Sequence, residues 1–285
     1  MRIVLIIALF IVSLQAKSFF SNKEQESNAK YINELKNLVI ATQKTRGLTN
    51  SYLNGNESAL LLIQANKRSM KKAIGEMEAL PLSSNPIISS RATSISQALI
   101  KLNSKAMTQK ASTTFKSYTE QIEQTLMLAQ TVSKQGSQDL NKLGQEASAI
   151  MMETILPLTE QIGRMRGMGS GIVAKKAMKD TQKYAMIAML NEIDDLESKL
   201  QAQMSLITAS NSEYYSSTVA IDLQKLHKSV KDYISLTNTK VISSTVARGC
   251  SSSEYFDHGT DIISILMLIF DANRKAIVSD SKGWI

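Results

Sequence analysis

The chain has 285 residues, of which 43% are hydrophobic, 20% charged and 5% aromatic, with only 3 prolines and 12 glycines. That apolar content is enough for a sizeable core, and the scarcity of proline and glycine favours long helices over strands and tight turns. The net charge of +8 could suit nucleic acid, a membrane surface or anionic ligands. However, the basic residues are spread along helical segments without the clusters and interleaved aromatic side chains of a nucleic-acid groove. We therefore expect an all-α protein that does not bind nucleic acid.

The N-terminus is typical of a secretory signal peptide. A basic start at Arg2 is followed by an apolar run over Ile3–Leu14 and by the small residue Ala16. The run is shorter than the roughly 20 residues that a membrane-spanning helix needs. We predict a cleaved signal peptide over residues 1–16, export to the periplasm, and an N-terminal extension over residues 17–27. Because Leu14 rather than alanine lies two residues before Ala16, an uncleaved membrane anchor is the alternative.

Apolar residues recur at helical spacing in eight segments after this extension. The predicted helices cover about residues 28–53, 57–80, 87–106, 113–133, 139–174, 176–207, 212–237 and 253–275. Pro157 lies inside the fifth of them, which predicts a kink there. The loops between the helices are short, so consecutive helices should be antiparallel neighbours. Residues 276–285 are expected to form a C-terminal tail.

The two halves of the chain resemble each other. Gln43–Leu53 aligns with Gly163–Val173 at an offset of 120 positions, and Phe115–Ile122 matches Phe256–Ile263 at an offset of 141. Self-similarity of this kind indicates a structural repeat. We predict two antiparallel four-helix bundles, with halves at about residues 28–135 and 136–275.

The first alignment superimposes two Arg-Gly pairs, at Arg46 and Arg166. Glycine after each arginine allows another backbone or a ligand to approach closely, and a planar guanidinium suits planar or trigonal oxyanions. In one interpretation the two arginines converge on a small oxyanion between the long helices. In the other, which spacing alone favours, each arginine is exposed or pairs with an acidic neighbour such as Glu57 or Glu160.

The run Gln43–Leu53 follows the pattern Q-x-x-R-G-L-[ST]-x-x-Y-L after a signal peptide. It resembles the first-helix signature of NIT domains, the nitrate- and nitrite-sensing domains of bacterial signalling proteins. Glu254–Phe256, with Thr260 and Ile263, resembles the closing helix of the family. The resemblance covers residues 28–275. It implies a pair of four-helix bundles with nitrate or nitrite bound by arginines between the first helices of the two bundles.

Carried onto this sequence, the resemblance implies that Arg46 and Arg166 bind the ligand. Arg164, close to the second pair, and Arg248, before the last helix, are further candidates. Arg164 and Arg166 are two positions apart and so do not share a helical face, and Arg248 fits a solvated loop residue equally well. Thr45 stands where many family members have an acidic residue or a second arginine, which leaves the exact contacts open.

Catalytic and metal-binding motifs are not recognisable. His227, His258 and Cys250 lack metal-ligand spacing. The sequence has no nucleophile-elbow serine and no phosphate-binding glycine loop. We expect neither enzymatic activity nor a metal or cofactor.

The resemblance implies a periplasmic sensor or binding protein for nitrate or nitrite. Family members are usually fused to an output module and this sequence ends at Ile285, so we expect a membrane-bound histidine kinase or similar receptor as its partner. Two alternatives remain: a helical sensor for an organic carboxylate, and an adaptor protein without a small ligand. Whether the chain forms a homodimer is left open.

Overall fold

In the computed structural model, the chain is helical almost throughout residues 2–138, 140–243 and 249–282, which are the residues that the structure describes. The α-helices are α1 (Arg2–Leu53), α2 (Ala59–Glu78), α3 (Pro86–Lys105), α4 (Ala111–Gly136), α5 (Lys142–Ile150), α6 (Leu156–Lys175), α7 (Asp180–Ser210), α8 (Thr218–Leu236) and α9 (Ser252–Lys282). Short 3-10 or π segments lie at Pro81–Ser84, Ala106–Thr108, Met151–Ile155 and Thr237–Ile242. No strand occurs among these residues, which confirms the all-α prediction.

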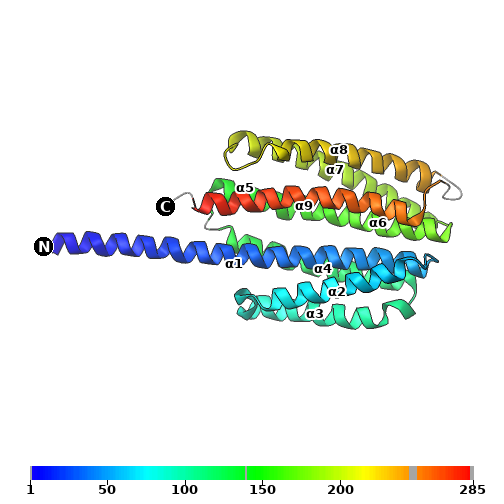
Figure 1. The fold of residues 1–285 in the computed structure, drawn as a ribbon, viewed down its shortest axis with the longest axis horizontal. Coiled ribbons are helices and arrows are strands. Elements are labelled where there is room, and N and C mark those ends of the chain that lie inside the picture. The colour runs from blue at the N-terminus through cyan, green and yellow to red at the C-terminus, as the bar shows by residue number, and fades with distance from the viewer. Residues whose placement is uncertain (1, 139, 244–248, 283–285) are drawn as a thin grey trace.

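The helices form two bundles that lie side by side (Figure 1). Helices α1 to α4 make the first bundle and α5 to α9 the second, with α5 and α6 joined end to end through a π-helical turn. Helix α1 packs against α2 and α4 in its own bundle, and against α6 and α9 across the interface. Most of the buried apolar side chains of both bundles belong to one continuous cluster, and a small second cluster contains Leu48, Ala59, Ile63 and Phe256. The predicted pair of four-helix bundles is confirmed, and the two bundles share a core.

Local sequence explains where several helices begin. The Asn85 side chain accepts hydrogen bonds from the backbone N–H groups of Ile87 and Ile88, and Pro86 occupies the first helical position of α3. Asn141 caps α5 in the same way through the N–H of Gly144. Such caps satisfy backbone donors that a helix start leaves unpaired. The boundaries predicted from the sequence are therefore close to those observed at these two starts.

The start of the first helix was predicted wrongly. We expected it near residue 28, but α1 begins at Arg2. No proline or glycine occurs before Gly47, so nothing in the sequence interrupts the helix. Its N-terminal part extends beyond both bundles (Figure 1). Within the described residues, no helix has the length and apolar character needed to span a membrane. The signal peptide over residues 1–16 remains a prediction.

The irregularity expected at Pro157 takes the form of a π-helical turn. The turn covers Met151–Ile155, and the N–H of Leu156 donates to the carbonyl of Met151, five residues earlier. Proline has no N–H to donate within the helix, and π turns are a common way to absorb such an interruption. The turn joins α5 to α6, so the two continue as one helical path toward the second Arg-Gly pair.

Candidate functional site

The two bundles are in close contact where α1 packs against α6, which we call the α1–α6 crossing. Glycines on both helices allow this close approach. A Cβ atom added to Gly47 would lie 3.2 Å from the Cα of Gly167, and one added to Gly167 would lie 3.1 Å from the Cα of Gly47. Contacts this short are tighter than ordinary packing allows, so a larger residue would force the helices apart. The crossing therefore brings Arg46 and Arg166, each next to its glycine, to the same interface.

Arg46 is fully buried and forms an ion pair with an acid. Its Nη1 donates to Oε1 of Glu160 at 2.6 Å and its Nη2 to Oε2 at 3.2 Å. Nη1 also donates to Oγ1 of Thr119 at 2.9 Å, and the guanidinium lies 5.0 Å from the centre of the Phe115 ring. Gln43 supports the acid through Nε2, which donates to Oε2 of Glu160 at 2.8 Å. Of the two interpretations, Arg46 thus fits the ion pair with Glu160, in the bidentate geometry that is strongest for such pairs.

Arg166 is also fully buried, but it has no such partner. Its Nη1 donates to Oγ1 of Thr260 at 2.9 Å, and the guanidinium lies 4.4 Å from the centre of the Phe256 ring. Its Nε and Nη2 have no hydrogen-bond partner, and no carboxylate of the described residues forms a salt bridge with it. Tyr233, also buried, interacts electrostatically with Arg166 and packs against Tyr255. Burial lowers the pKa of Arg166 to about 10, because a desolvated charge is disfavoured.

The two arginine environments are related by the internal repeat. We call Arg46, Thr119 and Phe115 the Arg46 half-site, and Arg166 with the equivalent threonine and phenylalanine of α9 the Arg166 half-site. In each, the threonine hydroxyl donates to the carbonyl of the phenylalanine four residues earlier, at 2.9 Å and 3.0 Å. The hydroxyl oxygen is thereby left to accept from the arginine.

From the sequence, these phenylalanines and threonines were recognised only as markers of the repeat, and their contacts with the arginines were not predicted. The available signal was the Phe-x-x-x-Thr spacing that both halves share.

Each phenylalanine also connects the two half-sites. A Cβ on Gly47 would lie 2.7 Å from the ring of Phe256, and one on Gly167 would lie 2.9 Å from the ring of Phe115. Each ring therefore packs between the arginine of its own bundle and the glycine of the other. A change in the packing of α1 on α6 must then move the rings, and with them the surroundings of both arginines.

Other polar atoms at the crossing are buried without hydrogen-bond partners. They include Oε1 of Gln43, Nε of Arg46 and Oγ1 of Thr49, all on α1. Buried polar atoms are almost always paired with protein or with bound water or ligand. Together with the unpaired nitrogens of Arg166, they make the α1–α6 interface the candidate for a small polar binding site. Among the described residues, no group of three potential metal ligands occurs.

Two further arginines, Arg164 and Arg248, were candidates from the sequence. Arg164 is partly buried, and its Nε is buried without a partner. No hydrogen bond or ion pair among the described residues links it to Glu160 or Arg166. Arg248 lies outside the described residues. The proposed contacts of both arginines with a ligand remain predictions.

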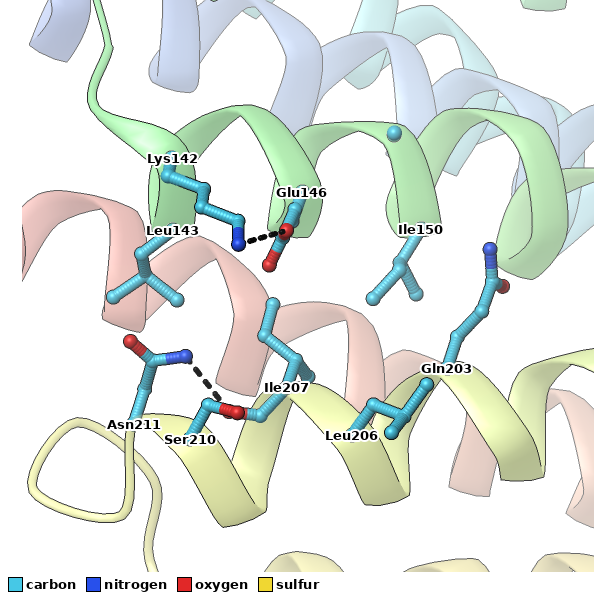
Figure 2. Close-up of a pocket in the computed structure, with 10 residues that line it drawn as sticks. Lys142, Leu143, Glu146, Ile150, Gln203, Leu206, Ile207, Ser210 and Asn211 are labelled. Atoms are coloured by element: carbon cyan, nitrogen blue, oxygen red, sulfur yellow. Dashed lines mark hydrogen bonds and ion pairs between the residues drawn. The ribbon is translucent and has the colours of Figure 1, made fainter.

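A separate cavity of about 440 Å³ lies between α5 and α7 (Figure 2). Lys142 lies at its edge and pairs with Glu146, with Nζ 3.7 Å from Oε1. Asn211 donates to the carbonyl of Ile207 at 2.9 Å, and Leu206 is exposed. The cavity contains neither Arg46 nor Arg166, and its one cation is already paired and solvated. We therefore place the candidate site at the α1–α6 crossing, where a buried cation is unpaired.

Comparisons with known proteins agree with this architecture. The family model described as "Nitrate and nitrite sensing" (NIT) matches residues 37–266. A solved structure described as the NasR transcription antiterminator is similar over 98% of this chain and 75% of that chain, with a TM-score of 0.66 and 9% sequence identity. At that identity the likeness shows a common fold. A search of curated proteins finds no match. Because the family match covers most of the sequence and both arginine half-sites, the chain belongs to the NIT family of nitrate and nitrite sensing domains.

Proposed function

We propose that this protein is a non-catalytic periplasmic sensor that binds nitrate or nitrite between its two bundles and relays binding to a membrane-bound signalling partner. One observation carries the proposal: Arg166 is fully buried at the α1–α6 crossing with two unpaired guanidinium nitrogens. An unpaired buried charge is costly, and a small anion would remove much of that cost.

The free nitrogens of Arg166 suit a planar oxyanion. Nε and Nη2 lie on one edge of the guanidinium plane, whereas Nη1 is used by Thr260. Two parallel N–H groups on one edge bind two oxygens of a planar anion in bidentate fashion. Nitrate and nitrite have the required planar arrangement of oxygens and are small enough for a site within packed helices.

Relay follows from the position of the site at the interface. Helix α1 belongs to the first bundle and α6 to the second, and they touch at their glycines. A ligand shifts a conformational equilibrium only if it binds one arrangement better than another. Neutralising the charge of Arg166 changes the electrostatic free-energy cost of packing α1 closely on α6. Helix α1 continues from this crossing to the N-terminal end of the fold. The family, which serves signalling proteins, supports a histidine kinase or similar receptor as the recipient.

Calorimetric titration of the mature protein tests this function. We expect nitrate or nitrite to bind with a stoichiometry of one and Arg166→Ala to abolish binding, whereas Lys142→Ala in the separate cavity leaves it unchanged. No binding of either anion at millimolar concentration, or undiminished binding to Arg166→Ala, would overturn the proposal. Preferential binding of acetate or another carboxylate would instead favour an organic-acid sensor. If no anion raised the thermal stability, an adaptor without a ligand would be favoured.

A further inference from the structure

The two half-sites share their scaffold but differ in one acid. Arginine, threonine, phenylalanine and glycine recur in both, whereas Glu160 forms hydrogen bonds with Arg46 and none with Arg166 among the described residues. Glu160 lies on α6, and the equivalent position on α1, 120 residues earlier, is Ile40. Ile40 is partly buried and packs against the apolar core. The repeat thus offers two equivalent positions for a carboxylate facing an arginine, and only one of them holds an acid.

The Glu160 carboxylate has the form of a bound planar anion. It presents two oxygens to two nitrogens of Arg46, at 2.6 Å and 3.2 Å, and accepts a third hydrogen bond from Gln43. It is almost fully buried. A free planar oxyanion bound to Arg166 would make the same kind of contact with the unpaired edge of that guanidinium. Glu160 therefore serves as the anionic partner of Arg46, as a free anion would serve for Arg166.

The buried charges at the crossing have a net charge of one positive unit. Arg46 and Arg166 contribute two and Glu160 removes one. Of the nearby groups, Lys44 is partly buried and Asp257 exposed. They are of opposite sign and act on each other, since Asp257 raises the pKa of Lys44 while burial and Arg166 lower it. A singly charged anion would make the buried set neutral, whereas a doubly charged one would leave an uncompensated negative charge.

We propose that Glu160 is a built-in anionic ligand of the Arg46 half-site, which leaves Arg166 as the single half-site for an external anion and restricts that anion to one negative charge. The inference rests on the proposed function, because it assumes that an anion binds at this crossing. It adds that selectivity against sulfate and phosphate is set by a carboxylate of the protein, and that the two arginines are not interchangeable.

Substitution of the acid by its neutral isostere tests the proposal. Glu160→Gln keeps the size of the side chain and removes its charge. We expect the ratio of nitrate to sulfate affinity, measured by calorimetry, to fall by at least about tenfold, because sulfate would then meet two uncompensated arginines. Glu146→Gln on α5, which removes a solvated carboxylate, controls for the change in net charge and should leave the ratio unaltered. An unchanged ratio in Glu160→Gln would overturn the proposal.

Substitution of the equivalent residue, Ile40, tests the proposal without changing Glu160. Ile40→Glu places an acid at the equivalent position of the first repeat, where it should pair with Arg166. It should weaken nitrate binding by at least about tenfold, because it competes for Nη2 of Arg166 and neutralises the guanidinium charge. Ile40→Gln is the neutral control and should bind nitrate more tightly than Ile40→Glu. Circular dichroism and the melting temperature establish that both variants fold. Equal nitrate affinity in the two would contradict the proposal.

Combining the two substitutions should move the anion-binding site from Arg166 to Arg46. In Glu160→Gln/Ile40→Glu we expect nitrate binding to return and to depend on Arg46 instead of Arg166. Loss of binding on Arg166→Ala but not on Arg46→Ala in this background would refute the proposal. If the wild-type protein binds neither nitrate nor nitrite, the proposed function itself fails. If it binds them but these variants leave selectivity and stoichiometry unaltered, only the role of Glu160 fails.

Discussion

The Arg46 and Arg166 half-sites show that two repeats can keep the same positioning residues while the partners of their arginines differ. Each guanidinium is buried, stacks on a phenylalanine and donates to a threonine on the last helix of its bundle. In the first, an acid from the other bundle completes the set. In the second, two nitrogens remain unpaired. The shared residues therefore position the arginines, and the one unshared acid leaves Arg166 as the arginine without a carboxylate partner.

Because of this difference, we expect the Arg46 half-site to contribute to stability and the Arg166 half-site to contribute to function. Arg46 and Glu160 form a bidentate pair that joins α1 to α6. Arg166 is desolvated without a carboxylate, and burial lowers its pKa to about 10. The first half-site should therefore hold the bundles together, whereas the second retains an electrostatic cost that an anion can offset. Variants of the two arginines should behave differently, and the following predictions are ordered by expected effect.

The largest effect is expected for Arg46→Met. This change leaves the Glu160 carboxylate buried without its cation, which should lower the free energy of unfolding by about 3–5 kcal/mol. Urea denaturation at pH 7 measures it, with Arg91→Met on the exposed face of α3 as the control. A loss under about 1 kcal/mol, within the range of surface ion pairs, would show that the pair does not hold the interface.

A smaller effect is expected for Gly47→Ala and Gly167→Ala. Each added methyl would overlap the opposing Cα and an aromatic ring, so each variant should lose about 1–3 kcal/mol through overpacking. Gly75→Ala, in α2 with open space around it, should instead gain about 0.5–1 kcal/mol. Thermal unfolding compares the three. Unequal losses at Gly47 and Gly167 would mean that the shared frame is less symmetric than its contacts suggest.

The next effect concerns pH. Only the protonated guanidinium of Arg166 binds an anion, and its pKa is about 10 because of burial. Nitrate affinity should therefore be fully present below pH 10 and fall by about tenfold for each unit above it, which is about 1.4 kcal/mol per unit. Calorimetry from pH 7 to 11, with circular dichroism to confirm folding, measures this. An affinity that already declines between pH 7 and 9 would assign binding to a group other than Arg166.

The smallest effect on stability is expected for Arg166→Met without ligand. Removing a buried charge that has no acidic partner should change the free energy of unfolding by less than about 1 kcal/mol, since replacing buried charges with apolar groups is often neutral or stabilising. The same variant should lose the thermal stabilisation by nitrate that the wild type shows. Destabilisation comparable to that of Arg46→Met would remove the distinction between the half-sites.

Part of the site was accessible from the sequence. The repeat of the Arg-Gly pair and its resemblance to the NIT signature identified Arg46 and Arg166, which the structure brings to one crossing. The apolar spacing identified the helices between them. The threonine and phenylalanine anchors were visible as repeated residues, but nothing in their spacing showed that they face an arginine on another helix. The start of α1 was misplaced because we took it from the helical apolar spacing that begins at Tyr31, whereas no residue before that breaks a helix.

By itself, the sequence determined that this protein is helical, that it is built from two similar halves, and that each half presents an arginine beside a glycine. These properties depend on residues close together in the chain, through helical periodicity and the absence of helix-breaking residues. Only the tertiary structure decided which arginine is paired. Glu160 lies 114 positions from Arg46, and it meets that guanidinium because glycines let α1 and α6 touch. Pairing between distant helices depends on how their faces pack, which local spacing does not specify.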